Sequence, residues 1–130
     1  MNLRLGLITV LVENYQTAVD FYRNVLGCEI IKDTTGADSQ RYLHLNFKGT
    51  KDQGIWLLKP HNDEQRQKIG NQTSGQPLMV IYTDNINEVI LNIRRENARI
   101  IEKDLPLKAD KFVKFSDLYG NEIIIIQSFD

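Results

Sequence analysis

Three polar side chains alternate with apolar ones along a short segment of the chain: Tyr42, His44 and Asn46. Residues 42–48 are predicted to form a strand, and because successive side chains of a strand point to opposite faces, these three share one face. A neutral imidazole such as that of His44 could serve as a general base near neutral pH. The sequence shows no carboxylate that would orient it, so His44 is a weak catalytic candidate, and a hydrogen-bonded or solvent-facing histidine is the alternative.

Four further residues have chemistry of their own. Trp56, the single tryptophan, could stack on a planar ligand or fill space inside the fold. Lys114 could hold an anionic substituent, although lysines on strands are commonly solvated. Cys28 is the single cysteine, so it has no partner for an internal disulfide, and we expect a buried, unreactive thiol. His61 lies in a polar stretch, where we expect it to be solvated.

The composition is that of a folded protein without a strongly charged surface. With 130 residues, 42% of them hydrophobic, the chain is predicted to be a single domain over residues 1–130. Its formal net charge of −1 provides no long-range field for nucleic acid or an anionic membrane. The longest apolar run, Ile123–Ile126, is far shorter than the roughly 20 residues of a membrane helix, and the start lacks a signal-peptide core. We therefore predict a cytoplasmic protein with no nucleic-acid or membrane partner.

The elements that position these side chains follow from hydrophobic periodicity. An apolar, β-branched run predicts a first strand over Leu3–Val12. A helix is predicted next, capped by Thr17 with Asp20 and ended by Gly27. Its apolar stripe consists of Ala18, Phe21, Tyr22, Val25 and Leu26. Three more strands are predicted over Cys28–Lys32, Tyr42–Lys48 and Ile55–Lys59.

A polar stretch over residues 60–76 interrupts this pattern and is predicted to be a linker. Within it, residues 62–69 could form a short surface helix. Beyond it, Asn85 and Glu88 stand at capping-box spacing before a second amphipathic helix. The strands predicted in this second half are Leu78–Thr83, Arg99–Glu102, Phe112–Ser116 and Glu122–Ser128.

The two halves have the pattern of copies of one supersecondary unit. Gly27 and Asn97 follow the two helices at equivalent places, and these residue types best tolerate the left-handed conformation that ends a helix. The sequence therefore predicts an α+β fold of two tandem βαβββ units, over about residues 1–60 and 77–130. Three strands follow the first helix before the second unit begins, and this excludes the ferredoxin-like βαββαβ order, in which only two strands separate the helices.

Two segments carry a resemblance to a known family. Residues 12–27 look like the first strand, turn and helix of the vicinal oxygen chelate superfamily, with Phe21-Tyr22 and Val25-Leu26-Gly27 at their familiar places. The turn Asp117-Leu118-Tyr119-Gly120-Asn121 is similar to the turn before that family's last strand, from which Leu118 and Tyr119 depart. The chain thus resembles the glyoxalase, bleomycin resistance protein and extradiol dioxygenase fold. The resemblance implies an open mixed sheet that encloses a cleft.

The same resemblance identifies four positions that hold a metal in the metal-dependent members of the family. In this sequence they are occupied by Leu7, Trp56, Leu78 and Ile124. None offers the imidazole, carboxylate or thiolate that a divalent cation requires. A shift of one residue on the second or fourth of these strands brings in only further apolar side chains. We therefore expect no metal site and no cofactor.

Strand alternation within the family's cleft gives the expected ligand-binding residues. They are Leu7, Thr9, Tyr42, His44, Asn46, Trp56, Leu58, Leu78, Tyr82, Lys114 and Ile124. Most are apolar or aromatic, so the hypothesis is a metal-independent small-molecule-binding protein of the bleomycin-resistance type, with an apolar or aromatic ligand. The resemblance also implies a homodimer. Two alternatives are a divalent-metal-dependent lyase, isomerase or dioxygenase-like enzyme, and a non-catalytic interaction module whose cleft is packed shut.

Overall fold

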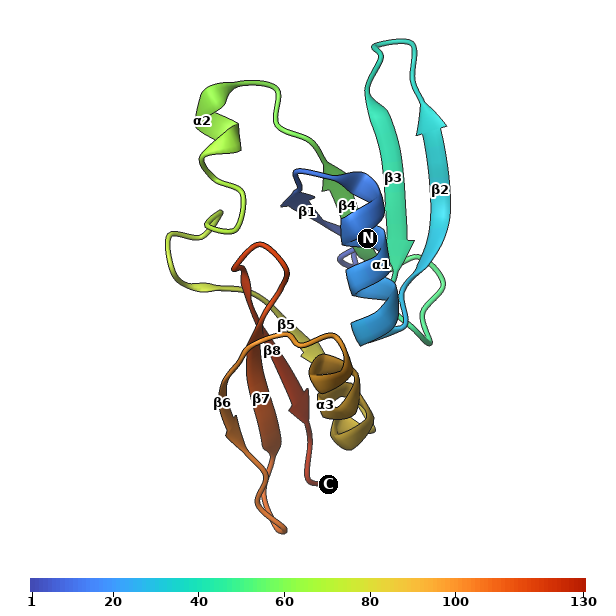
Figure 1. Ribbon diagram of the computed structural model, residues 1–130. Coiled ribbons are helices and arrows are strands. Elements are labelled where there is room, and N and C mark those ends of the chain that lie inside the picture. The colour runs from blue at the N-terminus through green and yellow to red at the C-terminus, as the bar shows by residue number, and fades with distance from the viewer. The chain divides into compact units, whose positions relative to one another are not determined.

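The computed structural model describes all residues from Met1 to Asp130, which form two compact units, Met1–Ile69 and Gly70–Asp130 (Figure 1). Each unit contains one open, four-stranded mixed sheet with a long helix. The predicted α+β fold of two tandem βαβββ units is confirmed. No helix is both long and apolar enough to span a membrane.

In unit 1 (Met1–Ile69), the sheet has the strand order β1-β4-β3-β2. Strands β1 and β4 run parallel, and the other neighbours are antiparallel. Because β1 and β4 are parallel, α1 and the β2–β3 hairpin must connect them. The elements are β1 (Leu7–Leu11), α1 (Tyr15–Leu26), β2 (Glu29–Thr35), β3 (Arg41–Asn46), β4 (Gly54–Leu58) and α2 (Asp63–Arg66).

Unit 2 (Gly70–Asp130) repeats this topology with the order β5-β8-β7-β6. Its parallel pair is β5 with β8, and the other pairs are antiparallel. The helix α3 packs against β7 and β8. The elements are β5 (Pro77–Tyr82), α3 (Ile86–Arg95), β6 (Ile100–Asp104), β7 (Lys111–Ser116) and β8 (Glu122–Gln127).

The helix termini follow local rules, with one correction. The side chain of Asn14, not Thr17 with Asp20, caps α1, because Asn14 Oδ1 accepts the backbone N–H of Thr17 at 2.9 Å. The predicted cap of α3 is confirmed, since Asn85 Oδ1 accepts the N–H of Glu88 at 3.2 Å. Gly27 at φ 68° and Asn97 at φ 54° follow the two helices in the left-handed region, also as predicted.

The first strand is shorter than its hydrophobic pattern predicts. The prediction of Leu3–Val12 is wrong at its start, because β1 begins only at Leu7, where it meets Gly54 of β4. The earlier Leu3 and Leu5 have no partner strand and are 86% and 67% exposed. An apolar pattern alone therefore overestimates the length of a strand when the neighbouring strand ends earlier.

The second strand is longer than predicted, and the linker helix is shorter. The prediction for residues 28–32 is corrected to β2 (Glu29–Thr35), every residue of which is exposed. An edge strand with both faces in solvent shows no alternation of apolar and polar residues, so its last residue cannot be located from the hydrophobic pattern. In β2 the pairing register shifts between Ile30 and Lys32, and in β6 it shifts at the equivalent place between Ile100 and Glu102. The helix proposed for residues 62–69 is limited to α2.

The single cysteine lies in the core of unit 1. Cys28 is 1% exposed, and burial raises the pKa of its thiol to about 12. A thiol that stays protonated at neutral pH is a weak nucleophile. The predicted burial of the thiol is confirmed, and its raised pKa agrees with the expected lack of reactivity.

Candidate functional site

Aromatic side chains gather on one face of the unit 1 sheet. Along β3 and β4 buried side chains alternate with partly exposed ones. The buried set, on the side of α1, is Leu43, Leu45, Ile55 and Leu57. Strand alternation therefore places Tyr42, His44 and Trp56 on the opposite face, which we call the open face.

These three rings form a cluster. Tyr42 and Trp56 stack with centroids 5.4 Å apart and an interplanar angle of 16°. His44, directly opposite Trp56 in the β3–β4 register, meets both rings edge-on, at 6.3 Å from Tyr42 and 5.5 Å from Trp56. Such geometries are the favourable ones for aromatic pairs. The cluster can therefore present a planar, apolar surface to a ligand.

The imidazole of His44 is not fully satisfied by the protein. Its Nε2 atom is buried and has no hydrogen-bond partner. Burial, with a smaller contribution from the charge of Lys32, lowers the pKa of His44. The ring is therefore neutral near pH 7. A buried nitrogen without a partner is uncommon in folded proteins and often has a functional explanation.

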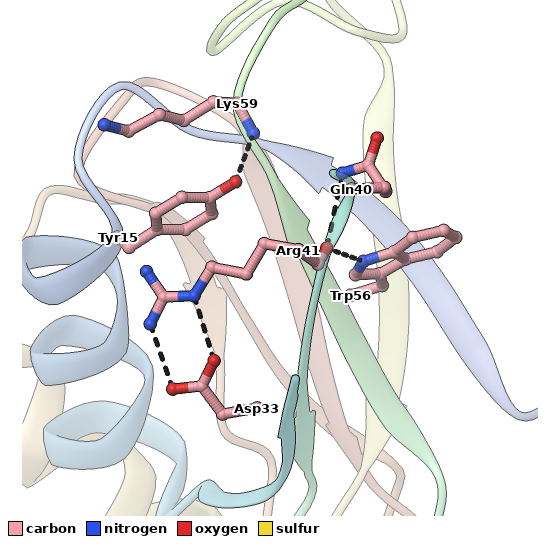
Figure 2. Close-up of polar contacts among 6 residues, drawn as sticks. All are labelled: Tyr15, Asp33, Gln40, Arg41, Trp56 and Lys59. Atoms are coloured by element: carbon pink, nitrogen blue, oxygen red, sulfur yellow. Dashed lines mark hydrogen bonds and ion pairs between the residues drawn. The ribbon is translucent and has the colours of Figure 1, made fainter. Parts of the chain in front are cut away.

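The orientation of Trp56 is fixed by a hydrogen bond to the backbone of β3. Its Nε1 atom donates to the carbonyl oxygen of Arg41 at 3.3 Å, and Gln40 Nε2 donates to the same oxygen at 3.3 Å. Figure 2 shows both donors converging on that carbonyl. This hydrogen bond satisfies the only polar atom of the indole and favours the observed orientation of the ring. The Trp56 ring is thus held in place before any ligand binds.

The side chain of Arg41 anchors this residue through contacts with Asp33 and Tyr15. The guanidinium forms a bidentate pair with Asp33 of β2, at 2.9 and 3.0 Å, and lies over the Tyr15 ring at 4.5 Å from its centroid. The hydrogen bond from Arg41 lowers the pKa of Asp33, which keeps the carboxylate charged. In Figure 2 the Tyr15 ring lies between the side chains of Arg41 and Lys59, and the Lys59 backbone N–H donates to the Tyr15 hydroxyl at 3.2 Å. This network connects α1, β2, β3 and the end of β4.

Hollows in unit 1 adjoin this polar network. One, of about 340 Å³, is lined by Tyr15, Arg41, Lys59 and His61, among others. A second, of about 370 Å³, shares Lys59 with the first. The indole of Trp56 does not line either of these two hollows. His61 is exposed, as expected.

The remaining predicted residues of unit 1 have different environments. Leu7 and Leu58 are partly buried, and Thr9, opposite Trp56 in the β1–β4 register, is exposed. The amide of Asn46 is engaged in the fold, donating to the Thr50 carbonyl at 2.7 Å and accepting from the Glu29 N–H at 3.2 Å. Of the polar side chains predicted on β3, Asn46 therefore has a structural role.

Most of the predicted residues of unit 2 share one face of its own sheet. Tyr82 and Ile124 alternate with the buried Met79 and with the buried isoleucines of β8, and Tyr82 is 72% exposed. Leu78 lies where the β5–β8 register shifts. Lys114 Nζ lies 3.5 Å from the carboxylate of Glu122. Because Lys114 has this partner, its charge is already balanced locally.

Sequence reasoning missed the residues that support Trp56. Asp33 and Arg41 flank the β2–β3 turn with opposite charges, a signal that predicts a cross-strand ion pair once both strands are extended far enough. Tyr15 and Lys32 have no such local signal, because their partners are brought to them by the sheet.

The donor atoms of the chain do not fit a divalent metal. No group of three or more His, Cys, Asp or Glu residues lies together anywhere in the structure. The four positions equivalent to metal ligands in the resembled family are hydrocarbon or indole groups.

Comparison with known proteins identifies similar sequences and folds. Residues 4–125 match the family described as the Glyoxalase/Bleomycin resistance protein/Dioxygenase superfamily. A metallothiol transferase FosB from Staphylococcus haemolyticus is 29% identical over 119 residues, covering 89% of this chain and 77% of that protein. The crystal structure of UcmS2 has a TM-score of 0.76 at 23% identity, covering 97% of this chain and 98% of that one. TnmS3, an antibiotic binding protein from Streptomyces sp. CB03234, has a TM-score of 0.72 at 20% identity, with 98% and 97% coverage.

Proposed function

Since this chain belongs to the Glyoxalase/Bleomycin resistance protein/Dioxygenase superfamily, we propose that it is a metal-independent small-molecule-binding protein. Its ligand is apolar or aromatic and stacks on Trp56 at the open face of the unit 1 sheet. The observation that carries the proposal is the partly exposed indole held in one orientation by the Arg41 carbonyl. The neighbour TnmS3, an antibiotic binding protein of the same fold, supports small-molecule binding in general.

Burial energetics favour a ligand at this face. A large apolar side chain left in water forgoes about 1.5 to 3 kcal/mol of burial free energy. Trp56 is partly exposed in the stack with Tyr42, so a planar ligand gains contact area there without first reorganising the indole. Fixing a binding group before the ligand arrives reduces the entropy lost on association.

The alternative is a metal-dependent reaction, which is suggested by the description of the relative FosB as a metallothiol transferase. Leu7, Trp56, Leu78 and Ile124 supply no lone pair suited to a divalent cation. His44 has no carboxylate within hydrogen-bond distance that would orient it as a base, and the cluster around it is aromatic. We therefore derive no catalytic step, and binding is the function that these residues support.

Two organisational features remain part of the proposal. We propose that the two units act together as one domain, and that the protein forms a homodimer. The exposed Val80 and Tyr82 of β5, 48% and 72% accessible, are apolar surface that an interface would cover. Light scattering at micromolar concentration tests the homodimer, and a monomer would contradict it. A non-catalytic module with a closed cleft is the second alternative.

The decisive experiment is a titration of planar aromatic compounds followed by the emission of Trp56, the single tryptophan. Saturable changes that calorimetry reproduces with metal-free protein are the expected result. Elemental analysis of the purified protein is the accompanying measurement. A stoichiometric transition metal whose removal abolishes binding would contradict the proposal, as would a panel that gives no saturable response.

A further inference from the structure

We infer that Tyr42 fills, in the free protein, a slot that takes a planar aromatic acid, whose acid group is held by Lys32 and His44. This inference rests on the proposed function and names the charge class of its ligand. In the free protein, the Tyr42 ring occupies the position that the aromatic ring of the ligand takes in the complex. The ligand differs from Tyr42 by carrying a carboxylate or similar anionic group.

The walls of the slot are the three residues around the Tyr42 ring. Trp56 stacks on one side of it, and His44 meets it edge-on. The ammonium of Lys32 lies 5.3 Å from its centroid. Aromatic stacking and cation–π contacts are the interactions that a planar ligand would use in the same place.

The charge in the slot has no counter-ion. Lys32 of β2, His44 of β3 and Trp56 of β4 form one row across the sheet. The acidic residues of the β2–β3 hairpin beyond Lys32 are engaged elsewhere: the carboxylate of Asp33 binds Arg41, and Asp38 accepts the Tyr42 hydroxyl at 3.2 Å. Lys32 forms no ion pair, and its ammonium lies over the Tyr42 ring. An anionic group on a ligand would supply the missing partner.

His44 adds a hydrogen-bonding atom that the protein leaves unused. Its buried Nε2 has no partner, and the imidazole ring lies edge-on to the Tyr42 and Trp56 rings. Binding of the acid group here requires that displacement of Tyr42 exposes this atom, since a neutral imidazole protonated at Nε2 can donate to a carboxylate oxygen. A ligand acid group between Lys32 and His44 would then satisfy both. Hydrogen bonds to charged groups are among the stronger ones.

Tyr42 is suited to leave the slot. Its hydroxyl donates a hydrogen bond to Asp38, an exposed residue of the β2–β3 turn. Exposed contacts of this kind contribute little to stability. Movement of the Tyr42 ring therefore leaves the buried side chains of β3 in place. It also leaves the hydrogen bond from Trp56 Nε1 to the Arg41 carbonyl oxygen intact.

The test compares naphthoate with naphthamide, which share a ring system and differ in charge, by Trp56 quenching and by calorimetry. We expect Tyr42→Ala to bind naphthoate about fivefold more tightly than wild type, because the stack no longer has to be broken. Tyr42→Phe, which keeps the ring, is the matched control and should show no such gain. Wild type should prefer naphthoate to naphthamide, and Lys32→Gln should remove that preference. Lys103→Gln, the same charge change on β6, should retain it.

The outcomes separate this inference from the proposed function. Three results would contradict the slot but leave the proposed aromatic-binding function standing. They are equal binding of acid and amide by wild type, equal effects of Lys32→Gln and Lys103→Gln, and weaker naphthoate binding by Tyr42→Ala. If neither probe bound to wild type or Tyr42→Ala while other planar compounds did bind, the acid class would be wrong. Absence of binding by every planar compound would overturn the proposed function together with the inference.

Discussion

His44 and Trp56 stand directly opposite each other on adjacent strands, their rings 5.5 Å apart at 73°, yet the Nε2 atom of His44 has no hydrogen-bond partner. A buried polar atom left unsatisfied costs about 1 to 3 kcal/mol of stability. The free protein therefore keeps a polar group in an aromatic environment at a cost. Such a loss of folding stability is expected where a residue, here His44, contributes to ligand binding and not to folding.

Replacing His44 by phenylalanine should stabilise the free protein. His44→Phe preserves a planar ring against Trp56 and removes the unsatisfied nitrogen, so we expect the free energy of unfolding to rise by about 1 kcal/mol. Denaturant melts measure it. The control is His61→Phe at an exposed position, where little change is expected. A loss of stability in His44→Phe would show that the imidazole has a partner in solution.

The stability of the wild type should depend on pH through His44. Burial lowers its pKa in the folded state below the ordinary value of 6.5, so the unfolded state binds the proton more readily. Stability is then fully present above that value and falls as the pH drops from it towards the folded-state pKa. Melts between neutral and mildly acidic pH should show this decline, and a smaller one in His44→Phe. Identical pH profiles for the two proteins would contradict the assignment.

Trp56→Ala separates binding from packing. If Trp56 is a platform, its removal should weaken the binding of a planar ligand by about 1 to 3 kcal/mol. If it mainly fills the core, its removal should instead cost about 3 to 5 kcal/mol of folding stability. Because Trp56 is only partly buried, we expect the first result, measured by calorimetry with melts in parallel. A large loss of stability with unchanged affinity would reject the platform.

A pair of glycines tests how closely β3 and β4 approach. A Cβ atom at Gly54 would lie 1.8 Å from the carbonyl oxygen of Leu45, whereas one at Gly6 would meet nothing within 4 Å. We expect Gly54→Ala to lower the free energy of unfolding by about 3 kcal/mol or more, because backbone must move. Gly6→Ala should change it by less than about 0.5 kcal/mol. Similar melts for the two variants would show that the strands are further apart than described.

The parts of the fold with regular periodicity could be predicted from the sequence. Tyr42, His44 and Trp56 could be assigned to one face because β3 and β4 are each buried on one side only, so apolar and exposed positions alternate. Both helix ends could be predicted because Gly27 and Asn97 are residue types that tolerate positive φ.

The rest depends on contacts that no local pattern encodes. Strand β2 lies at an edge with every residue exposed, so its extension to Thr35 and the pair between Asp33 and Arg41 had no hydrophobic signal. The cap of α1 was misassigned because Asn14 and Thr17 are both good capping residues, and the backbone conformation decides between them. The role of Lys32 appears only when the register sets it opposite His44.

The register shifts in β2 and β6 bear on aggregation. These two strands end their sheets, and each leaves one row of backbone N–H and C=O groups without a neighbouring strand. Such a row is a template for pairing with the strands of other chains. Each strand carries an extra residue, Ile31 in one and Ile101 in the other, where the regular ladder is broken. A broken ladder disfavours extension into a continuous intermolecular sheet, so the two repeats blunt the β2 and β6 edges of their sheets in the same way.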